Sequence, residues 1–316
     1  MLQDILIITI LALFALIVGV VLVISFRLSS RIVTPNTSDP DQCYIDEIAL
    51  GKIITKEYEQ DYHREDFKLQ SDYGYTLSGS FIPRDPNVMR EDKKERVVVL
   101  VHGYTFCQFG SVKYINIFRK LGFHCVIYDH RNHGYSDKAV TTMGYYEARD
   151  LKKVCDYIRM KLGEDIIIGT HGESMGAATV MMNAPLDNQL AFVIEDCGYS
   201  DLSDQLAYNL KKIYHLPRFP FLRIASLFSR LRGGIFFHQV IPKNEVAKCD
   251  SLPMLFLHGE LDDFVPTSMI KQIYDVKKGY RRMRIFPNAA HAESYWNNQE
   301  EYNREIKEFL KEINII

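Results

Sequence analysis

Short stretches of continuously apolar residues alternate with helical periodicity through most of the chain. Residues 97–101, Val-Val-Val-Leu-Val, contain no polar position, which is typical of a strand covered on both faces of a sheet. Similar runs recur at 122–128, 166–168, 192–194, 254–257 and 283–286. Apolar residues at helical spacing separate them, for example Leu151, Val154 and Ile158. The alternation predicts an α/β fold with a mostly parallel, doubly wound sheet.

Other patterns flank this alternation. Residues 67–70 and 76–82 lie on either side of Ser-Asp-Tyr-Gly-Tyr, which predicts a β-hairpin. Residues 34–41 contain two prolines and several polar residues, which is typical of a linker. We expect an amphipathic helix at 46–60 and a last helix at 300–313.

The N-terminal pattern is different, because residues 5–26 include no charged side chain. A run of about 20 apolar residues spans a bilayer, so the segment predicts a transmembrane helix. A signal peptide is the competing interpretation, but the preceding residues carry Asp4 and no Lys or Arg, and no Ala-x-Ala site follows. A buried core helix would show a polar face. We therefore expect a membrane anchor within residues 1–30.

The charges around this run predict its orientation. Arg27 and Arg31 follow the apolar segment, and only Asp4 precedes it. The positive-inside rule then places the main domain in the cytoplasm, with the chain crossing the cell membrane once. The six cysteines are scattered and form no Cys-x-x-Cys pair, which argues against a zinc site or a disulfide framework.

Length and charge limit the remaining choices. The chain has 316 residues, a formal net charge of -2 and 47% hydrophobic residues. These values fit one α/β domain with insertions. The near-neutral net charge argues against a nucleic-acid-binding protein, which would carry an excess of basic residues. We expect an anchor at 1–30, a linker with a packing helix at 31–65, and the main domain at 66–316. The sequence assigns no oligomeric state.

One insertion interrupts the strand–helix alternation at about 199–248. Residues 199–243 carry seven Lys or Arg, two acidic residues and many aromatic and aliphatic side chains. We interpret the segment as a helical cap. Beside a membrane anchor, its basic and aromatic character suggests a surface that meets anionic lipid. Alternatively, its aromatic residues pack onto the core and its charges are only solvated, and the pattern fits both interpretations.

The clearest chemical motif is Gly-Glu-Ser-Met-Gly at 172–176, between an apolar run and a helical run. This context favours a nucleophile elbow over an ordinary strand–helix turn. A strained serine needs small neighbours, which explains Gly172 and Gly176. The sequence therefore predicts Ser174 as a nucleophile.

An acyl-transfer nucleophile needs two backbone donors for the oxyanion. The amide of Met175, directly after the serine, is one candidate. The loop after the 97–101 strand supplies the other, and we expect the amide of Tyr104, next to Gly103, in this role. Phe106 and Phe109 in the same loop either line an acyl pocket or pack the loop itself.

A serine also needs a base and an orienting acid. His291 follows the last strand in a loop of small residues, and Asp262 follows the strand before it. The order Ser174, Asp262, His291 is that of nucleophile-elbow hydrolases. Asp196 and Asp263 are alternative acids. Several other histidines also lie near strand ends, namely His102, His130, His133, His171 and His258.

Four motifs occur in a familiar order: His-Gly-Tyr-Thr at 102–105, Asp-His-Arg-Asn-His-Gly-Tyr-Ser at 129–136, Gly-Glu-Ser-Met-Gly, and His-Gly-Glu-Leu-Asp-Asp-Phe-Val-Pro at 258–266. With the late His291 they resemble the α/β-hydrolase superfamily from about residue 66 onward. More narrowly, the chain is similar to bacterial membrane-anchored serine hydrolases of the monoacylglycerol-lipase-like and serine-aminopeptidase-like group. Two features depart from that group, because many of its lipases have His in place of Glu173 and the cap shares no motif with it.

These observations predict a hydrolase of carboxylic esters with small to medium acyl groups, lipid-derived acids included, that works through an acyl-enzyme. No metal or organic cofactor is implied, since the turn that holds His130 and His133 fits a structural loop better than a metal pair. An amidase, peptidase or thioesterase would use the same triad. Acyl transfer and a non-catalytic, membrane-tethered binding protein are further alternatives.

Overall fold

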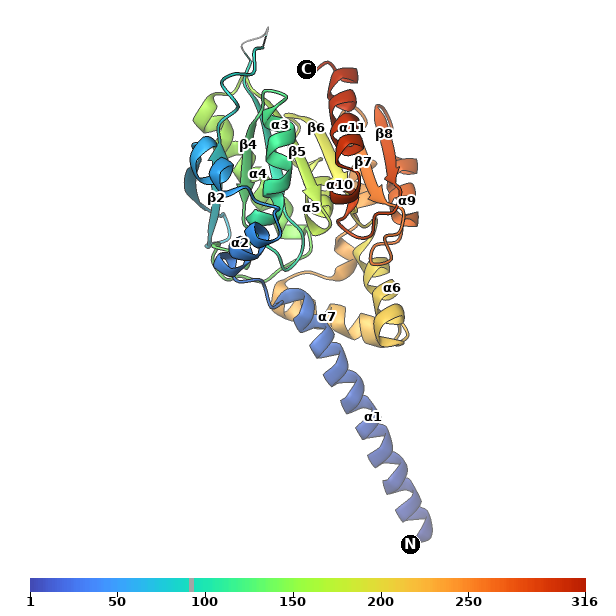
Figure 1. The fold of residues 1–316 in the computed structure, drawn as a ribbon. Coiled ribbons are helices and arrows are strands. Elements are labelled where there is room, and N and C mark those ends of the chain that lie inside the picture. Colours follow the sequence, from blue (N-terminus) through green and yellow to red (C-terminus); the bar gives the residue numbers. More distant parts are fainter. Residues whose placement is uncertain (91–93) are drawn as a thin grey trace.

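One eight-stranded sheet organises the computed structural model, which describes residues 1–90 and 94–316 (Figure 1). The strand order is β1-β2-β4-β3-β5-β6-β7-β8, and only the pairs β1–β2 and β2–β4 are antiparallel. The strands are β1 (Glu65–Gln70), β2 (Thr76–Ile82), β3 (Arg96–Val101), β4 (His124–Tyr128), β5 (Ile167–Glu173), β6 (Leu190–Asp196), β7 (Met254–Gly259) and β8 (Arg281–Phe286). The predicted mostly parallel sheet is confirmed, and β1 and β2 form the predicted hairpin.

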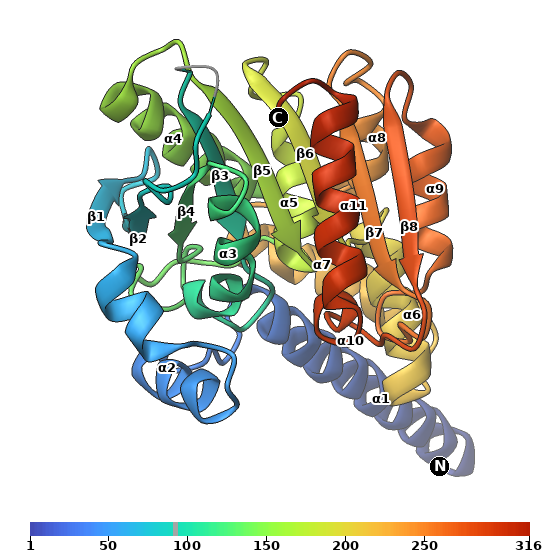
Figure 2. The ribbon, with the colours of Figure 1, turned by 45° about the horizontal axis from the view of Figure 1, so that its top comes forward.

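Helices cover both faces of the sheet because its central strands are apolar on both faces. In β3, Val98 and Leu100 face a core under α3 (Ile115–Arg119) and α11 (Gln299–Glu312), which lie on one side in Figure 2. Val97 and Val99 face the opposite core. That second core is closed by α4 (Tyr145–Leu162), α5 (Met175–Asn183), α8 (Pro242–Val246) and α9 (Ser268–Val276). Shorter helices are η2 (Gln108–Tyr114), η3 (Phe237–Gln239) and α10 (Ser294–Asn297).

The segment between the apolar run and the sheet differs from its prediction. A helix over 46–60 is wrong, because α2 spans Pro40–Ala49 and a separate turn, η1, spans Glu57–Asp61. The carboxylate of Asp39 accepts a hydrogen bond from the amide of Gln42 at 3.0 Å, and Pro40 occupies the first turn. Both are helix-start signals, so the linker ends at residue 39.

Helix α1 (Leu2–Val33) projects from the lower end of the domain in Figure 1. It is the one helix in the described part of the chain that is long and apolar enough to cross a membrane. None of its most apolar window is buried, which excludes the core-helix interpretation. A signal sequence near an N-terminus also meets this criterion of length and hydropathy.

The insertion after β6 forms a helical cap. Helices α6 (Leu202–Tyr214) and α7 (Phe221–Gly233) lie at the lower end of the sheet in Figure 1, beside the last turns of α1. The end of the insertion returns to the domain, because Val246 of α8 is buried in the core beneath α5 and α9. The cap proper is therefore shorter than the predicted 199–248.

Candidate active site

Ser174 occupies the tight turn between β5 and α5. Its backbone has φ 57° and ψ -115°, a conformation that a non-glycine residue adopts only when its surroundings enforce it. A Cβ at Gly172 would lie 2.2 Å from the carbonyl oxygen of Gly176, and one at Gly176 would lie 2.1 Å from that of Val101. Both positions therefore exclude any side chain, and the turn holds the serine at the end of the strand.

Three residues far apart in the sequence meet at this edge of the sheet. The hydroxyl of Ser174 lies 2.8 Å from Nε2 of His291, and Nδ1 of His291 lies 2.8 Å from Oδ2 of Asp262. They follow β5, β8 and β7 respectively, and the carboxyl ends of neighbouring parallel strands lie at one edge. The geometry is that of a nucleophile, a base and an orienting acid.

The carboxylate of Asp262 has other hydrogen-bond partners besides His291. Its Oδ1 accepts hydrogen bonds from the amides of Phe264 at 3.0 Å and Val265 at 2.8 Å, and Nε2 of His258 lies 3.3 Å from Oδ2. Burial raises the pKa of Asp262, but hydrogen bonds from His258, His291 and Val265 outweigh it and hold the pKa well below its usual value. The carboxylate therefore stays ionised beside the imidazole.

The alternative acids have other partners. The carboxylate of Asp263 pairs with Lys212 of the cap at 2.6 Å on the surface. Asp196 accepts hydrogen bonds from Ser294 at 3.2 Å and Tyr302 at 3.0 Å. Burial, with a contribution from the nearby carboxylate of Glu173, raises the pKa of Asp196 to about 6. Asp262 is the predicted acid that contacts His291.

The other histidines near strand ends are buried and serve the loops. His102 accepts a hydrogen bond from the amide of His130 at 3.0 Å, and His133 accepts one from that of Thr105 at 3.2 Å. His171 bonds the hydroxyl of Tyr302 at 2.7 Å. Among the described residues, the only set of three metal-type ligands is Cys197, Asp262 and His291, whose ligand atoms lie within 4.8 Å of one another. Two of these three already hydrogen-bond to each other.

The expected oxyanion donors lie beside the serine. Met175 begins α5, and the first amides of a helix have no partner within it. Gly103 packs against the nucleophile, since a Cβ there would lie 3.5 Å from that of Ser174. The next residue, Tyr104, lines both cavities described below, and its hydroxyl donates to the carbonyl of Arg31 in α1. The 102–105 loop is thus fixed against both the serine and the apolar helix.

Two cavities of opposite character share Ser174 and Tyr104. The first has a volume of about 180 Å³ and is almost entirely apolar. Its walls come from Leu28 and Ile32 of α1 and from both cap helices, with Leu206, Leu210 and Leu222 among the lining residues.

The second cavity, of about 510 Å³, lies on the other side of the serine and is charged. Its ion pairs are Lys113 with Glu173 at 2.5 Å and Lys52 with Glu47 at 3.1 Å. Both ammonium groups lie within 6 Å of the Trp296 ring centroid, Lys52 at 5.6 Å and Lys113 at 5.8 Å. A nonpolar group fits one side of Ser174, and a polar group fits the other.

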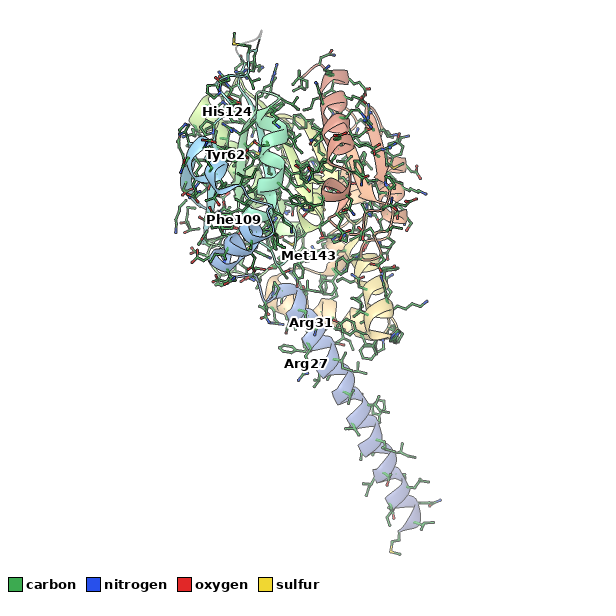
Figure 3. The ribbon with its side chains drawn as sticks, in the orientation of Figure 1. Arg27, Arg31, Tyr62, Phe109, His124 and Met143 are labelled. Atoms are coloured by element: carbon green, nitrogen blue, oxygen red, sulfur yellow. The ribbon has the colours of Figure 1, made fainter. Side chains whose placement is uncertain are left out.

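The two predicted pocket residues lie in different places. Phe106 lines the charged cavity. Phe109, labelled in Figure 3, lines neither cavity and takes the other expected role, which is packing within the domain. There it packs against Tyr44 and Tyr58, with ring centroids 4.9 and 6.0 Å apart.

The sequence analysis missed the residues that line the apolar cavity, above all those of α1. Ser25 and Ser29 were the available signal. Both are fully buried against α7, and small polar residues four apart in an apolar helix indicate a packed face.

The fold and the Ser174–His291–Asp262 arrangement define an α/β hydrolase, and the chain belongs to the α/β-hydrolase superfamily. A sequence model described as alpha/beta hydrolase fold matches residues 96–191. The uncharacterized protein YqkD of Bacillus subtilis (strain 168) is 36% identical over 268 residues, 84% of each chain. The predicted superfamily and the prediction of a hydrolase enzyme are both confirmed.

More distant relatives include lipases and esterases. Lysophosphatidylserine lipase ABHD12 of Macaca fascicularis is 24% identical over 229 residues, 68% of this chain and 55% of its own length. The chain therefore spans about half the length of that relative. The Pyrococcus furiosus esterase Pf2001 has a TM-score of 0.65 at 22% identity, over 81% of this chain and 93% of that one. Est1E of Butyrivibrio proteoclasticus, solved with ferulic acid, has a TM-score of 0.65 at 19% identity, over 79% and 100%. The two structures share the fold.

Proposed function

We propose that this protein is a serine esterase that cleaves carboxylic esters through an acyl-enzyme. The hydrogen-bonded series Ser174–His291–Asp262, with both distances at 2.8 Å, carries the proposal. Ser174 attacks the carbonyl carbon while Nε2 of His291 takes its proton. Asp262 stabilises the imidazolium, and the amides of Tyr104 and Met175 hold the oxyanion. The protonated His291 then gives its proton to the leaving alcohol, and water releases the acid by the same steps in reverse.

The two cavities support a division of the substrate. The apolar cavity of about 180 Å³ takes the acyl group. It slightly exceeds cavities of about 150 Å³ that hold benzene, so an acyl group of roughly six to eight carbons fits it. The charged cavity is lined by Lys52 and Lys113 and by three glutamates, two of which pair with these lysines, and it suits a polar alcohol. Esters that join a lipid-derived acid to a polar alcohol meet both conditions, and the similarity to a lysophosphatidylserine lipase is consistent with them.

The same proposal includes a location. We assign the apolar part of α1 as a single-pass anchor in the cell membrane, with the hydrolase domain from about residue 66 onward in the cytoplasm. Arg27 and Arg31 after the apolar run support this orientation. Protease treatment of intact cells tests it, and cleavage of the hydrolase domain from outside would contradict it.

Labelling of the full-length protein with a fluorophosphonate probe tests the chemistry. Wild type and Ser251→Ala, a change at an exposed serine outside both cavities, should label equally, whereas Ser174→Ala should not label. Matched hexanoyl esters, thioesters and anilides of one chromophore then separate the esterase from the thioesterase and the amidase. Faster turnover of the anilide than of the ester would replace the proposal with an amidase or peptidase.

A further inference from the structure

The last turns of α1 form part of the apolar cavity at the serine. Leu28, Arg31 and Ile32 line it together with Ser174. Ile32 is only 8% exposed, although most of the helix before it is bare. The guanidinium of Arg31 hydrogen-bonds the hydroxyl of Tyr214 in α6, and its charge lies 5.4 Å from that ring's centroid. The helix that carries the membrane-length run thus also closes the site.

Small residues hold α1 and α7 in close contact. Ser25 and Ser29 of α1 are fully buried, as are Ala225 and Ser229 of α7. A Cβ at Gly233 would lie 3.4 Å from a methyl group of Val33. Small residues spaced four apart allow two helix backbones to approach closely, as in membrane helix pairs.

Polar and aromatic contacts fix the same pair of helices in register. The guanidinium of Arg232 donates to Ser30 at 2.7 Å and lies 4.8 Å from the ring centroid of Phe26. Phe26 also packs edge-on against Phe228, with centroids 5.4 Å apart. The end of α1 is therefore a packed part of the domain, and its cavity-lining side chains have fixed positions.

The cavity lies close to the end of the apolar run. Residues 5–26 would extend about 33 Å as a helix, enough to cross the hydrocarbon core. Leu28 and Ile32 follow at about 3 and 9 Å along the axis. Figure 3 shows Arg27 and Arg31 at this level, where α1 meets the cap. Large apolar side chains of the cap, which lies at the end of the domain from which α1 projects, are solvent-exposed. Phe219 is 71% and Leu231 72% exposed.

We propose that the anchor helix is part of the active site, with Leu28 and Ile32 as specificity-determining residues for the acyl chain. The inference rests on the proposed esterase function and names its substrate class as single-chain amphiphilic esters. The first six to eight carbons fill the cavity against α1, and longer chains continue along α1 toward the bilayer. The same residues therefore set the preferred acyl length.

The test uses the full-length protein in lipid nanodiscs and p-nitrophenyl esters from acetate to dodecanoate. Leu28→Trp fills the cavity and is expected to lower the octanoate-to-acetate ratio of kcat/KM about tenfold, the equivalent of about two methylenes left unburied. Leu28→Ala should move the preferred acyl length to longer chains. Leu16→Trp, a matched change on the bare part of α1 where the leucine is 63% exposed, should keep the wild-type ratio.

The outcomes separate the two proposals. Wild-type ratios in both Leu28 variants would overturn the role of the anchor while leaving the esterase intact. Should Leu28→Trp fail to fold, the shift in Leu28→Ala decides the question. A wild-type protein that cleaves none of the esters and takes no fluorophosphonate would instead overturn the proposed function, and this inference with it.

Discussion

Replacing Asp262 with asparagine changes a single atom and should nearly abolish turnover. In the wild type, Oδ1 accepts the amides of Phe264 and Val265, while Oδ2 faces Nδ1 of His291 and Nε2 of His258. The two amides require an acceptor, so the asparagine oxygen must replace Oδ1 and its NH₂ group must face both imidazoles. Nδ1 of His291 then becomes the acceptor, and Nε2 carries the proton that it should remove from Ser174.

The magnitude follows from this change of tautomer. In a comparable Ser-His-Asp triad the same replacement lowers kcat about 10⁴-fold, or about 5 kcal/mol of transition-state stabilisation. We expect a loss of that size in kcat for p-nitrophenyl hexanoate. Asp263→Asn is the matched control, because that carboxylate pairs with Lys212 on the surface. A loss below about tenfold in Asp262→Asn, or an equal loss in Asp263→Asn, would refute the assigned acid.

The effect of Asp262→Asn on stability should also depend on pH. Because the pKa of Asp262 lies below its usual value in the folded protein, its stabilising contribution is present above its unfolded pKa, about 3.9, and is lost as the pH falls below it. The difference in Tm between wild type and Asp262→Asn should therefore stay constant down to about pH 5 and narrow as the pH is lowered from there to about 2. A constant difference would mean that the carboxylate is not stabilised by its neighbours.

Three further changes test other parts of the site. Gly176→Ala places a methyl group 2.1 Å from the carbonyl oxygen of Val101 and should lower the free energy of unfolding by about 1–3 kcal/mol, measured by thermal melts. Gly19→Ala is the control, because open space surrounds that position and stability should stay unchanged. Tyr104→Phe removes the hydroxyl that donates to the carbonyl of Arg31 and should lower the free energy of unfolding by about 1 kcal/mol. It should also lower kcat more than it raises KM, and an unchanged kcat would contradict the view that this hydrogen bond positions the 102–105 loop. Lys52→Gln removes the ion-pair partner of Glu47 in the charged cavity and should raise KM several-fold for esters of polar alcohols. It should leave KM for esters of apolar alcohols unchanged, with the exposed Lys56→Gln as control.

The sequence predicted those parts of the molecule that depend on local pattern. Buried parallel strands are apolar at every position, so β3 and the strands around it could be recognised directly. The order of the Ser174, Asp262 and His291 motifs fixed which loops should meet, because parallel strands end at one edge of the sheet. The helix over 46–60 failed because the Asp39–Pro40 start signal was read as part of a linker.

The apolar cavity lay outside the reach of such patterns. An apolar run predicts that a helix avoids water, but it does not show which of its residues contact protein and which contact lipid. Leu28 and Ile32 lie just past the end of that run, and the packing of the last turns of α1 against α7 brings them to the serine. The choice between the two roles of Phe109 was open for a related reason, since one 3₁₀ turn decides which way its ring points.

The close packing of α1 against α7 determines how the enzyme would meet its substrate. A domain on a slack tether rotates freely and samples molecules from the surrounding solution. Here the serine would keep a constant height and tilt relative to the bilayer, because the helix that fixes the depth also forms the cavity wall. Encounters would then take place by lateral diffusion within one leaflet. Turnover would follow the mole fraction of the ester among the lipids of that leaflet, and diluting the vesicles at constant composition would leave it unchanged.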